Sequence, residues 1–498
     1  MNTSLPVIVG AAQLIQRNAE LSEALDPLAL LHRVAKLAAE DAGGGDALLR
    51  SLDTICLVDA VGWHPDNAPA LLSDSIGAHA KTLITAPIGG ETGLALLNMA
   101  AMRIAAGHSR AAFVGGVNAL KTLRTAMKAG VSLTWPKGGS GELQTLSDPR
   151  PGQTEIERRH GLQRPTEFYP MFENALRARR RRGLQEHRVA LGRLFSPMTQ
   201  VAAQNPYAWF PTPRSVSELT TVSAANRMVS YPYTKYLNAV METDQAAGVL
   251  LMSSEAADAI GLARDRRMYW LGGSYAEEKA WFASERADLS RSEALAACAT
   301  RLLEAAHVSV NRVSLFDFYS CFPVAVELAC EAYGVAEDDP RGVTVTGGLP
   351  YAGGPGSNYT THAVAAMLER LRERRGMGLC TGNGWYLTKH AATLFGSEPP
   401  TQPFAARNLS EPKAVGGEPL EVVQQAAGRG RVEAYTITYD REGVPQTGIV
   451  VGRTDAGQRF VANTPQDRTL LASIAAQELC GVEGRVNVVD GLGKFDPS

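Results

Sequence analysis

The sequence predicts an α/β protein of two similar halves, with a helical insertion in the first half and a small all-β domain at its C-terminal end. Three observations predict this organisation. Apolar strands alternate with amphipathic helices over the first 120 residues, and the same order returns after residue 266. Between these stretches, residues 121–241 are polar and rich in Arg, Pro and aromatic residues. After a Pro- and Gly-rich segment, residues 418–498 alternate in the manner of short β-strands.

The composition is that of an ordinary globular protein, which excludes several functional classes. The chain has 498 residues, of which 45% are hydrophobic and 20% charged, enough for a large buried core. The 49 Lys and Arg residues nearly balance the 51 Asp and Glu residues, so the chain lacks the basic excess of a nucleic-acid binder. Residues 1–13 do not look like a signal peptide, and no apolar run approaches the length of about 18 residues that a membrane span needs. We expect no nucleic-acid partner and no membrane segment.

The cysteines indicate the compartment. All six are scattered, and none forms a Cys-x-x-Cys pair. This pattern argues against a disulfide scaffold and against a metal centre of the zinc type, and it suits a reducing cytosol. We therefore predict a cytoplasmic protein without a metal site.

The elements of the first half follow in order from their periodicity. Apolar residues recur at helical spacing over 28–41, and a strongly apolar helix over 94–106 ends at Gly107. Alternation of such helices with apolar strands predicts a mainly parallel sheet covered by helices. The predicted strands are 6–10, 54–58, 82–86, 111–114 and 245–253.

The remaining elements define the domain boundaries. We expect a mostly helical insertion over 121–241, because a structureless loop of that length is improbable. The first half then comprises 1–120 and 242–265, the second half 266–397, a linker 398–417, and a small barrel or sandwich 418–498. In the second half, strands are predicted at 268–272, 313–318 and 376–380, and helices at 292–306, 323–333 and 361–372.

A glycine-rich segment and two cysteines are the first candidates for a functional site. N–H groups of Gly353, Gly354 and Gly356 could hold an oxyanion or a phosphate, but a turn that needs positive φ explains the same glycines. Cys321 lies between a strand and a helix, where a helix N-terminus would lower the pKa of a thiol. Cys380 is predicted at a strand end, just before Asn383. Inert core cysteines remain the alternative for both.

Two histidines and an arginine cluster complete the candidates. His362 follows the glycine-rich segment near the start of a helix, and His390 follows Lys389. Each is a candidate acid or base, with a structural histidine as the alternative. The cluster that contains Arg179 and Arg180 could neutralise a phosphate-bearing ligand or could form a solvated helix face.

The order and spacing of these pieces resemble the thiolase superfamily over residues 6–397, most of all the thiolase-like proteins allied to the sterol-carrier-type thiolases. The resemblance implies a duplicated thiolase fold, with two βαβαβαββ halves in a five-layered αβαβα arrangement. Residues 432–463 resemble the OB-type barrel that accompanies some thiolase-like proteins and acyl-CoA aldolases, where it helps to shape the acyl-CoA channel. The segments that carry the resemblance are Pro6–Gly10, Gly93–Gly116, Asn226–Tyr233, Asp244–Ala247, Tyr319–Phe322, Gly347–Gly356 and Cys380–Gly382.

The departures from the family pattern bear on function. A glycine, Gly90, falls on the nucleophilic Cys of the family's Cys-x-Ser-Gly motif, and no cysteine lies between Cys56 and Cys298 to replace it. The His of the Gly-His-Pro motif aligns with Gly354, and the oxyanion-hole His aligns with Tyr319. Only the acid/base Cys of the Cys-x-Gly motif is kept, as Cys380. Thiolysis through an acyl-enzyme is therefore hard to support.

Three functions follow from the resemblance. The first is an enzyme of the acyltransferase class in lipid metabolism, resembling acetyl-CoA acetyltransferases, that acts at the carbon next to a CoA thioester without an acyl-enzyme. It would use Cys380 as acid/base, with Tyr319 and the glycine segment as oxyanion donors. The second is a retro-aldolase on a β-hydroxyacyl-CoA, with tyrosines as proton carriers, for which Tyr319, Tyr351 and Tyr359 are the candidates. The third is an acyl-CoA-binding protein without catalysis.

The resemblance also implies the ligands and the assembly. The ligand is acyl-CoA, and no cofactor is expected beyond the CoA thioester substrate. Thiolases hold the CoA 3′-phosphate with basic residues of the insertion, so we expect Arg179 and Arg180 to hold it here. Thiolases pair through the strand that leads to the nucleophile, which implies a homodimer. Pro87 and its neighbouring glycines would weaken that pairing, so a monomer is the alternative.

Overall fold

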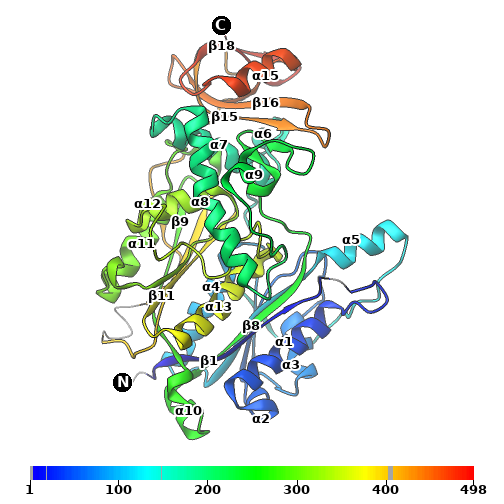
Figure 1. Ribbon diagram of the computed structural model, residues 1–498, viewed down its shortest axis with the longest axis vertical. Helices are drawn as coiled ribbons and strands as arrows, with labels where there is room; N and C mark the ends of the chain where they lie inside the picture. Colours follow the sequence, from blue (N-terminus) through cyan, green and yellow to red (C-terminus); the bar gives the residue numbers. More distant parts are fainter. Residues whose placement is uncertain (1–3, 18, 147, 402–407, 498) are drawn as a thin grey trace.

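The computed structural model describes residues 4–17, 19–146, 148–401 and 408–497. The predicted linker over 398–417 therefore lies partly outside the described residues. Two sheets organise the molecule, a large one that bends through the main body and a smaller one that forms the C-terminal domain at the end of the long axis (Figure 1). No described helix is both long enough and apolar enough to cross a bilayer.

The first half supplies five strands of the large sheet in the order β3-β2-β4-β8-β1. The strand β1 pairs antiparallel with β8, which pairs antiparallel with β4, whereas β4, β2 and β3 run parallel. The strands are β1 (Pro6–Ile15), β2 (Thr54–Val58), β3 (Thr82–Ala86), β4 (Ala111–Ala119) and β8 (Asp244–Ser253). The helices are α1 (Pro27–Ala42), α2 (Gly45–Arg50), α3 (Ala68–Ser75), α4 (Thr92–Ala105) and α10 (Ser254–Ala259).

The second half repeats this pairing pattern. The strand β9 pairs antiparallel with β12, β12 pairs antiparallel with β11, and β11 runs parallel to β10. The predicted duplication is thus present in the topology, with β9, β12, β11 and β10 in the places of β1, β8, β4 and β2. The elements are β9 (Met268–Glu278), β10 (Leu315–Asp317), β11 (Met377–Gly384), β12 (Lys389–Gly396), α11 (Glu293–Ala306), α12 (Pro323–Tyr333) and α13 (Tyr359–Glu373).

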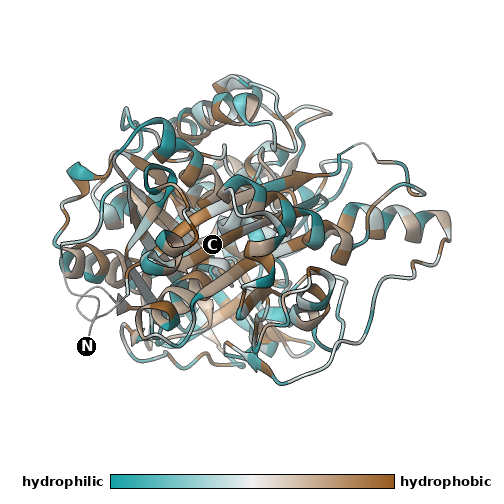
Figure 2. Ribbon diagram, turned by 90° about the horizontal axis from the view of Figure 1, so that it is seen from below, coloured by the Kyte–Doolittle hydropathy of each residue, from teal (hydrophilic) through white to brown (hydrophobic). Residues whose placement is uncertain are grey.

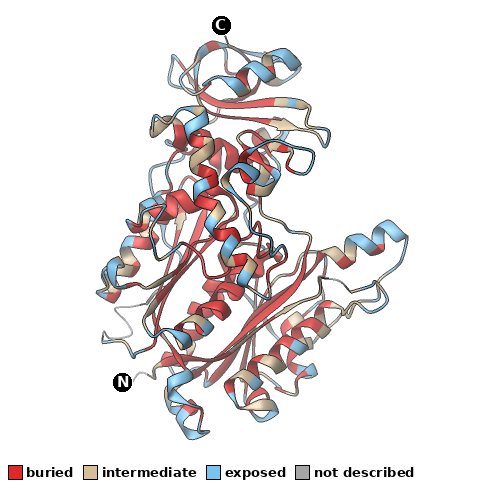
Figure 3. Ribbon diagram, in the orientation of Figure 1, coloured by how far each residue is buried: buried red, intermediate tan, exposed pale blue. Residues whose placement is uncertain are grey.

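Five layers result from the packing of helices on this bent sheet. The helices α4 and α13 contact strands of both halves and lie between them, while α1 and α3 cover the outer face of the first half and α11 that of the second. Figure 3 shows α4, α13 and the strands beside them mostly in the colour of buried residues, and Figure 2 shows hydrophobic residues along strands in the middle of the molecule. The expected five-layered α/β fold is therefore confirmed. The expectation of a mainly parallel sheet is wrong, because β1, β8, β9 and β12 all join through antiparallel pairs.

The insertion is mostly helical, as predicted, but it also supplies strands. Its short strand β5 pairs with β3 at the edge of the large sheet, and β6 pairs with β15 of the C-terminal domain. Its elements are α5 (Leu120–Ala129), β5 (Leu143–Thr145), α6 (Glu155–Arg159), α7 (Pro165–Arg179), α8 (Leu184–Gln204), α9 (Val216–Thr220), β6 (Met228–Ser230) and β7 (Tyr233–Thr234).

The C-terminal domain is a closed five-stranded barrel, in which β15 pairs with both β16 and β18 and thereby closes the order β16-β17-β19-β18-β15. Before the barrel, β13 and β14 pair with β9, so part of the predicted linker belongs to the main sheet. Arg177 of α7 forms an ion pair with Glu478 and ties the insertion to the domain. The elements are β13 (Asn408–Leu409), β14 (Ala414–Val415), β15 (Gly428–Tyr439), β16 (Pro445–Thr454), β17 (Arg459–Asn463), α15 (Arg468–Ala476), β18 (Glu483–Val489) and β19 (Leu492–Pro497).

Candidate functional site

A cavity of about 640 Å³ lies where the two halves, the insertion and the C-terminal barrel meet. Its volume is in the range of small-molecule sites. Six predicted or aligned positions line it: Gly90, Tyr319, Cys321, Gly354, Gly356 and Asn383. These residues come from segments far apart in the chain.

The phenol of Tyr319 stands in the space that a side chain at position 90 would occupy. A Cβ built on Gly90 would overlap the hydroxyl oxygen of Tyr319, and it would lie 2.5 Å from the carbonyl oxygen of Asn383. The backbone N–H of Tyr319 donates to Thr381 Oγ1 at 2.9 Å, and its ring meets Tyr359 edge-on at 5.5 Å. With Tyr319 so held, only glycine fits at position 90.

Neutral hydrogen-bonding groups surround Tyr319. The side-chain amide of Asn383 donates to the hydroxyl of Tyr169 at 2.9 Å and lies 3.9 Å from Cys321 Sγ, while the Tyr169 hydroxyl donates to the carbonyl of Trp385. The ring of Tyr169 stacks on Phe322 with centroids 4.4 Å apart. Tyr169, which the sequence analysis missed, thus belongs to the cavity through α7.

The titration of these groups is set by burial. Burial raises the pKa of Tyr319 and Tyr169 well above that of an ordinary tyrosine. Burial also raises the pKa of the Cys321 thiol to about 12. The expectation that a helix N-terminus lowers this pKa is wrong, because desolvation outweighs the dipole of α12. All three groups therefore stay protonated at neutral pH.

Cys380 and His362 do not line the cavity. Cys380 is fully buried on β11, and burial raises the pKa of its thiol well above the usual value. His362 Nδ1 lies 2.9 Å from Gln13 Oε1, and burial lowers the pKa of His362 to about 3. His390 is likewise buried and lies 3.1 Å from Ser292 Oγ. The structure gives these three residues structural environments, so the predicted acid/base roles of Cys380 and His362 need correction.

The glycine segment is mainly a turn. Gly353 and Gly356 have φ angles of 107° and 58°, which only glycine adopts readily. Gly354 and Gly356 line the cavity, but the N–H of Gly354 donates to Val240 and that of Gly356 to Gly354. The predicted oxyanion hole is therefore not preformed at Gly354 and Gly356. Of the candidate tyrosines, Tyr319 lines the cavity, whereas Tyr351 and Tyr359 do not.

Arg179 and Arg180 lie outside the cavity. Arg179 binds Glu331 at 2.7 Å, and Arg180 binds Glu327 and Glu337 at 2.6 Å each. The expected phosphate contact does not fit residues whose charges are already paired. Other arginines line the cavity instead: Arg164 and Arg227 of the insertion and Arg441 of the C-terminal domain. Single arginines in loops leave no sequence pattern, so the sequence analysis could not find them.

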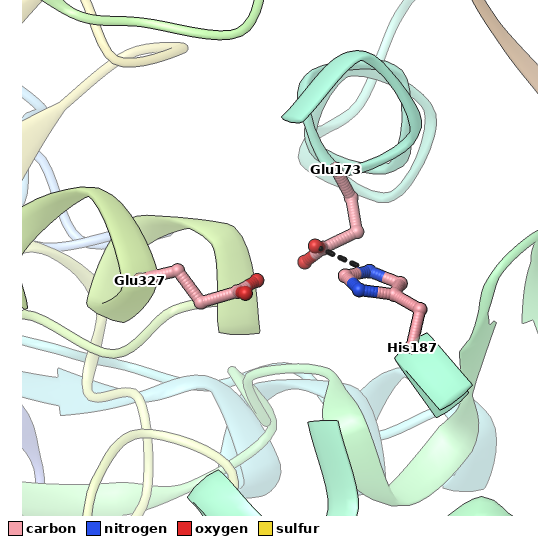
Figure 4. Close-up of side chains that lie close together, drawn as sticks. All are labelled: Glu173, His187 and Glu327. Carbon is pink, nitrogen blue, oxygen red and sulfur yellow. Dashed lines mark hydrogen bonds and ion pairs between the residues drawn. The ribbon is translucent and has the colours of Figure 1, made fainter. Parts of the chain in front are cut away.

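Two buried charged groups near the cavity were also missed. Glu91, next to Gly90, forms an ion pair of 2.7 Å with Lys389, and each side chain is 1% exposed. Glu173, His187 and Glu327 converge from three helices beside the cavity (Figure 4). Neither group forms a sequence motif, because its members are far apart in the chain.

Comparison with known proteins places these features in a family context. Residues 412–491 match the family model of the thiolase-like protein type 1 additional C-terminal domain. The chain is 30% identical to a solved structure, a monomeric SCP2-thiolase-like protein type 1 from Mycobacterium smegmatis, with a TM-score of 0.83 and 99% of both chains covered. No curated protein matches the sequence.

Two more distant structures share the fold of the main body. An acetyl-CoA acetyltransferase from Syntrophomonas wolfei is 15% identical with a TM-score of 0.58, over 80% of this chain and 100% of that one. The Ltp2-ChsH2(DUF35) aldolase is 14% identical with a TM-score of 0.59, over 80% of this chain and 98% of that one. At this level of identity, the similarity shows a shared fold and nothing more specific.

Proposed function

This chain belongs to the family of SCP2-thiolase-like proteins of type 1, and on that premise we propose that it binds an acyl-CoA thioester and makes or breaks the carbon–carbon bond next to the thioester without an acyl-enzyme. The observation that carries the proposal is the phenol of Tyr319 in the side-chain space of Gly90. A nucleophile cannot stand there, and a proton-donating hydroxyl stands there instead.

The cavity suits the shape and charge of a CoA thioester. Arg227 and Arg441 bring positive charge for phosphate groups, and bidentate phosphate binding is characteristic of arginine. Arg164 is paired with Glu167 at 2.8 Å. Tyr319, Asn383 and Cys321 supply neutral donors for the thioester end. Residues 438–441 of the C-terminal domain line the cavity as well. The fused domain would therefore shape the channel without a separate partner chain.

Retro-aldol cleavage is the reaction that this arrangement favours. The bond between the α- and β-carbons breaks, its electron pair passes into the thioester enolate, and the β-hydroxyl loses its proton as an aldehyde or ketone forms. Tyr319 would give its proton to the α-carbon as the bond breaks and receive the proton of the β-hydroxyl in the same relay, so that it ends protonated as it began. The aldolase among the structures of similar fold is consistent with this direction.

Acyl-CoA binding without catalysis is the second candidate, and a specific observation favours it. The groups around Tyr319 are donors that stay protonated, and the N–H groups of Gly354 and Gly356 are already used within the turn. The carboxylates of Glu167 and Asp440, which also line the cavity, accept backbone N–H groups. A site of this kind can bind a thioester and leave it unchanged.

Product analysis with purified protein separates the candidates. We expect aldehyde or ketone release from β-hydroxyacyl-CoA substrates, no thiolysis of acetoacetyl-CoA with CoA, and a loss of at least about 100-fold in kcat for Tyr319→Phe. Tyr351→Phe is the matched control, because the Tyr351 hydroxyl is buried without a partner and lies outside the cavity. Thiolysis at a substantial rate would refute the proposal. Binding without cleavage of any β-hydroxyacyl-CoA would establish the second candidate.

We also propose that the protein is a monomer. The strand β3 leads to Gly90 and would be the pairing strand of a dimer, but β5 of the same chain pairs with it through Leu83–Leu143, Ile84–Gln144 and Thr85–Thr145. The relative from M. smegmatis is described as monomeric. Sedimentation equilibrium at micromolar protein concentration tests this, and a dimer mass would contradict it.

A cytoplasmic location remains our proposal. All six cysteines carry free thiols, and five of them are buried. A reducing compartment maintains thiols in this state.

A further inference from the structure

Three buried side chains converge beside the cavity from three different helices. Glu173 lies on α7, His187 on α8 and Glu327 on α12, and each side chain is at most 1% exposed. One potential ligand atom from each lies within 4.8 Å of the others. Figure 4 shows the carboxylate of Glu327 pointing toward Glu173 and His187.

In each carboxylate, one oxygen accepts hydrogen bonds from residues outside the cluster, and the other oxygen is left for the cluster. Glu173 Oε2 accepts the hydroxyl of Tyr233 at 2.5 Å, and Glu173 Oε1 faces His187 Nε2 at 2.8 Å. Glu327 Oε1 accepts Arg180 and Arg182, whereas Glu327 Oε2 is buried without a hydrogen-bond partner. Outer donors that orient a carboxylate in this way are typical of metal ligands.

The cluster lacks a positive charge at its centre. Two carboxylates close together in a buried site need a proton or a cation between them, since neither is solvated. The arginines do not supply it, because both contact the outer oxygen of Glu327 and also pair with Glu337. An unsatisfied carboxylate oxygen at this depth is costly.

We propose that Glu173, His187 and Glu327 bind one divalent first-row transition metal ion, with Zn²⁺ as the representative. One imidazole nitrogen with two carboxylate oxygens is a donor set for Zn²⁺ or its neighbours, whereas Ca²⁺ and Mg²⁺ prefer oxygen alone. A cavity of about 590 Å³ is lined by Arg180 and Arg182, the two arginines that contact Glu327. The ion would clamp α7 and α8 of the insertion to α12.

The clamp adjoins the acyl-CoA cavity. Tyr233, which holds Glu173, stacks on Phe322 with centroids 5.7 Å apart, and Phe322 lines the cavity. Phe322 also directly precedes α12, which carries Glu327. The metal would therefore fix the wall that carries Cys321 and Phe322 without touching the substrate.

Metal titration of the full-length protein tests the site. We expect metal-free protein to bind one Zn²⁺ by calorimetry, and Co²⁺ to give visible absorption bands that Zn²⁺ abolishes. His187→Gln lowers the affinity at least about 100-fold, and Tyr233→Phe lowers it about tenfold through the outer hydrogen bond. His362→Gln is the matched control, since His362 is equally buried but lies outside the cluster.

The outcomes are distinct. Absence of Zn²⁺ binding and of Co²⁺ bands in the wild-type protein would overturn the proposal and leave a shared proton in the cluster. Equal Zn²⁺ affinity in wild type and His187→Gln would also overturn it, because the ion would then bind elsewhere. If His187→Gln does not fold, Tyr233→Phe takes its place in the comparison. A Zn²⁺ affinity of Tyr233→Phe equal to that of the wild type would then overturn the proposal. None of these measurements depends on acyl-CoA turnover.

Discussion

The hydroxyl of Tyr319 occupies the position that the first side-chain carbon would take at Gly90. The two residues are 229 positions apart and come from opposite halves of the duplicated fold. A residue larger than glycine at position 90 would therefore collide with Tyr319.

Substitution at Gly90 should be more costly while Tyr319 is present. We expect Gly90→Ala to lower the free energy of unfolding by about 1–3 kcal/mol, the usual cost of overpacking. In a Tyr319→Ala background the same change should cost less, since only the contact with the Asn383 carbonyl oxygen then remains. Urea denaturation of the four proteins in this cycle measures the coupling. Equal costs in the two backgrounds would show that the overlap does not govern this position.

The buried pair of Glu91 and Lys389 should contribute strongly to stability. Lys389→Met leaves Glu91 charged and unpaired in the interior, so we expect a loss of about 3–5 kcal/mol. Combining it with Glu91→Gln should restore part of that loss. Lys279→Met is the control, because its ion pair with Glu418 is solvent-exposed and such pairs contribute about 0–1 kcal/mol. Similar losses in both single variants would contradict the role of burial.

His362 should make stability depend on pH. Burial holds its pKa at about 3 in the folded state, below the usual value of 6.5. Protonation then favours the unfolded chain, so the contribution of His362 is complete above pH 6.5 and is lost as the pH falls toward 3. Between pH 7 and 5 the wild type should lose about 2 kcal/mol more than His362→Gln. The exposed His108→Gln is the control, and parallel pH profiles for wild type and His362→Gln would refute the prediction.

Arg441 should matter for CoA binding, and Arg179 should not. Arg441 lines the cavity, whereas Arg179 is paired with Glu331 outside it. Loss of one charged hydrogen bond to phosphate corresponds to about a tenfold or larger rise in Kd for Arg441→Gln. Calorimetric titration with CoA measures both variants. If Arg179→Gln weakens CoA binding more than Arg441→Gln does, the phosphate groups bind at the arginine cluster and the prediction is wrong.

Much of the fold was predictable because apolar periodicity marks the core. The strands over 54–58 and 82–86 were predicted to the residue. The strand β12 was missed, because Lys389 and His390 interrupt its apolar pattern. Lys389 pairs with Glu91 and His390 lies beside Ser292, both distant in sequence. Such contacts cannot be predicted from the local sequence pattern.

The site was predictable only where a family position marked it. Tyr319, Cys321 and Asn383 line the cavity, and their roles stay predictions. Cys380 was misplaced because β11 continues to Gly384, and alternation along the strand puts Cys380 and Asn383 on opposite faces. Tyr169, Arg164 and Arg227 come from the insertion and Arg441 from the C-terminal domain, and the placement of both over the cavity depends on tertiary packing.

Isothermal titration of CoA and acetyl-CoA into the full-length protein tests whether the cavity binds acyl-CoA. We expect one site per chain with a dissociation constant in the micromolar range. Binding should be weakened about tenfold or more in Arg441→Gln, whose side chain lines the cavity. Absence of binding up to millimolar ligand, with a protein that is folded by circular dichroism, would contradict the assignment of the cavity to acyl-CoA.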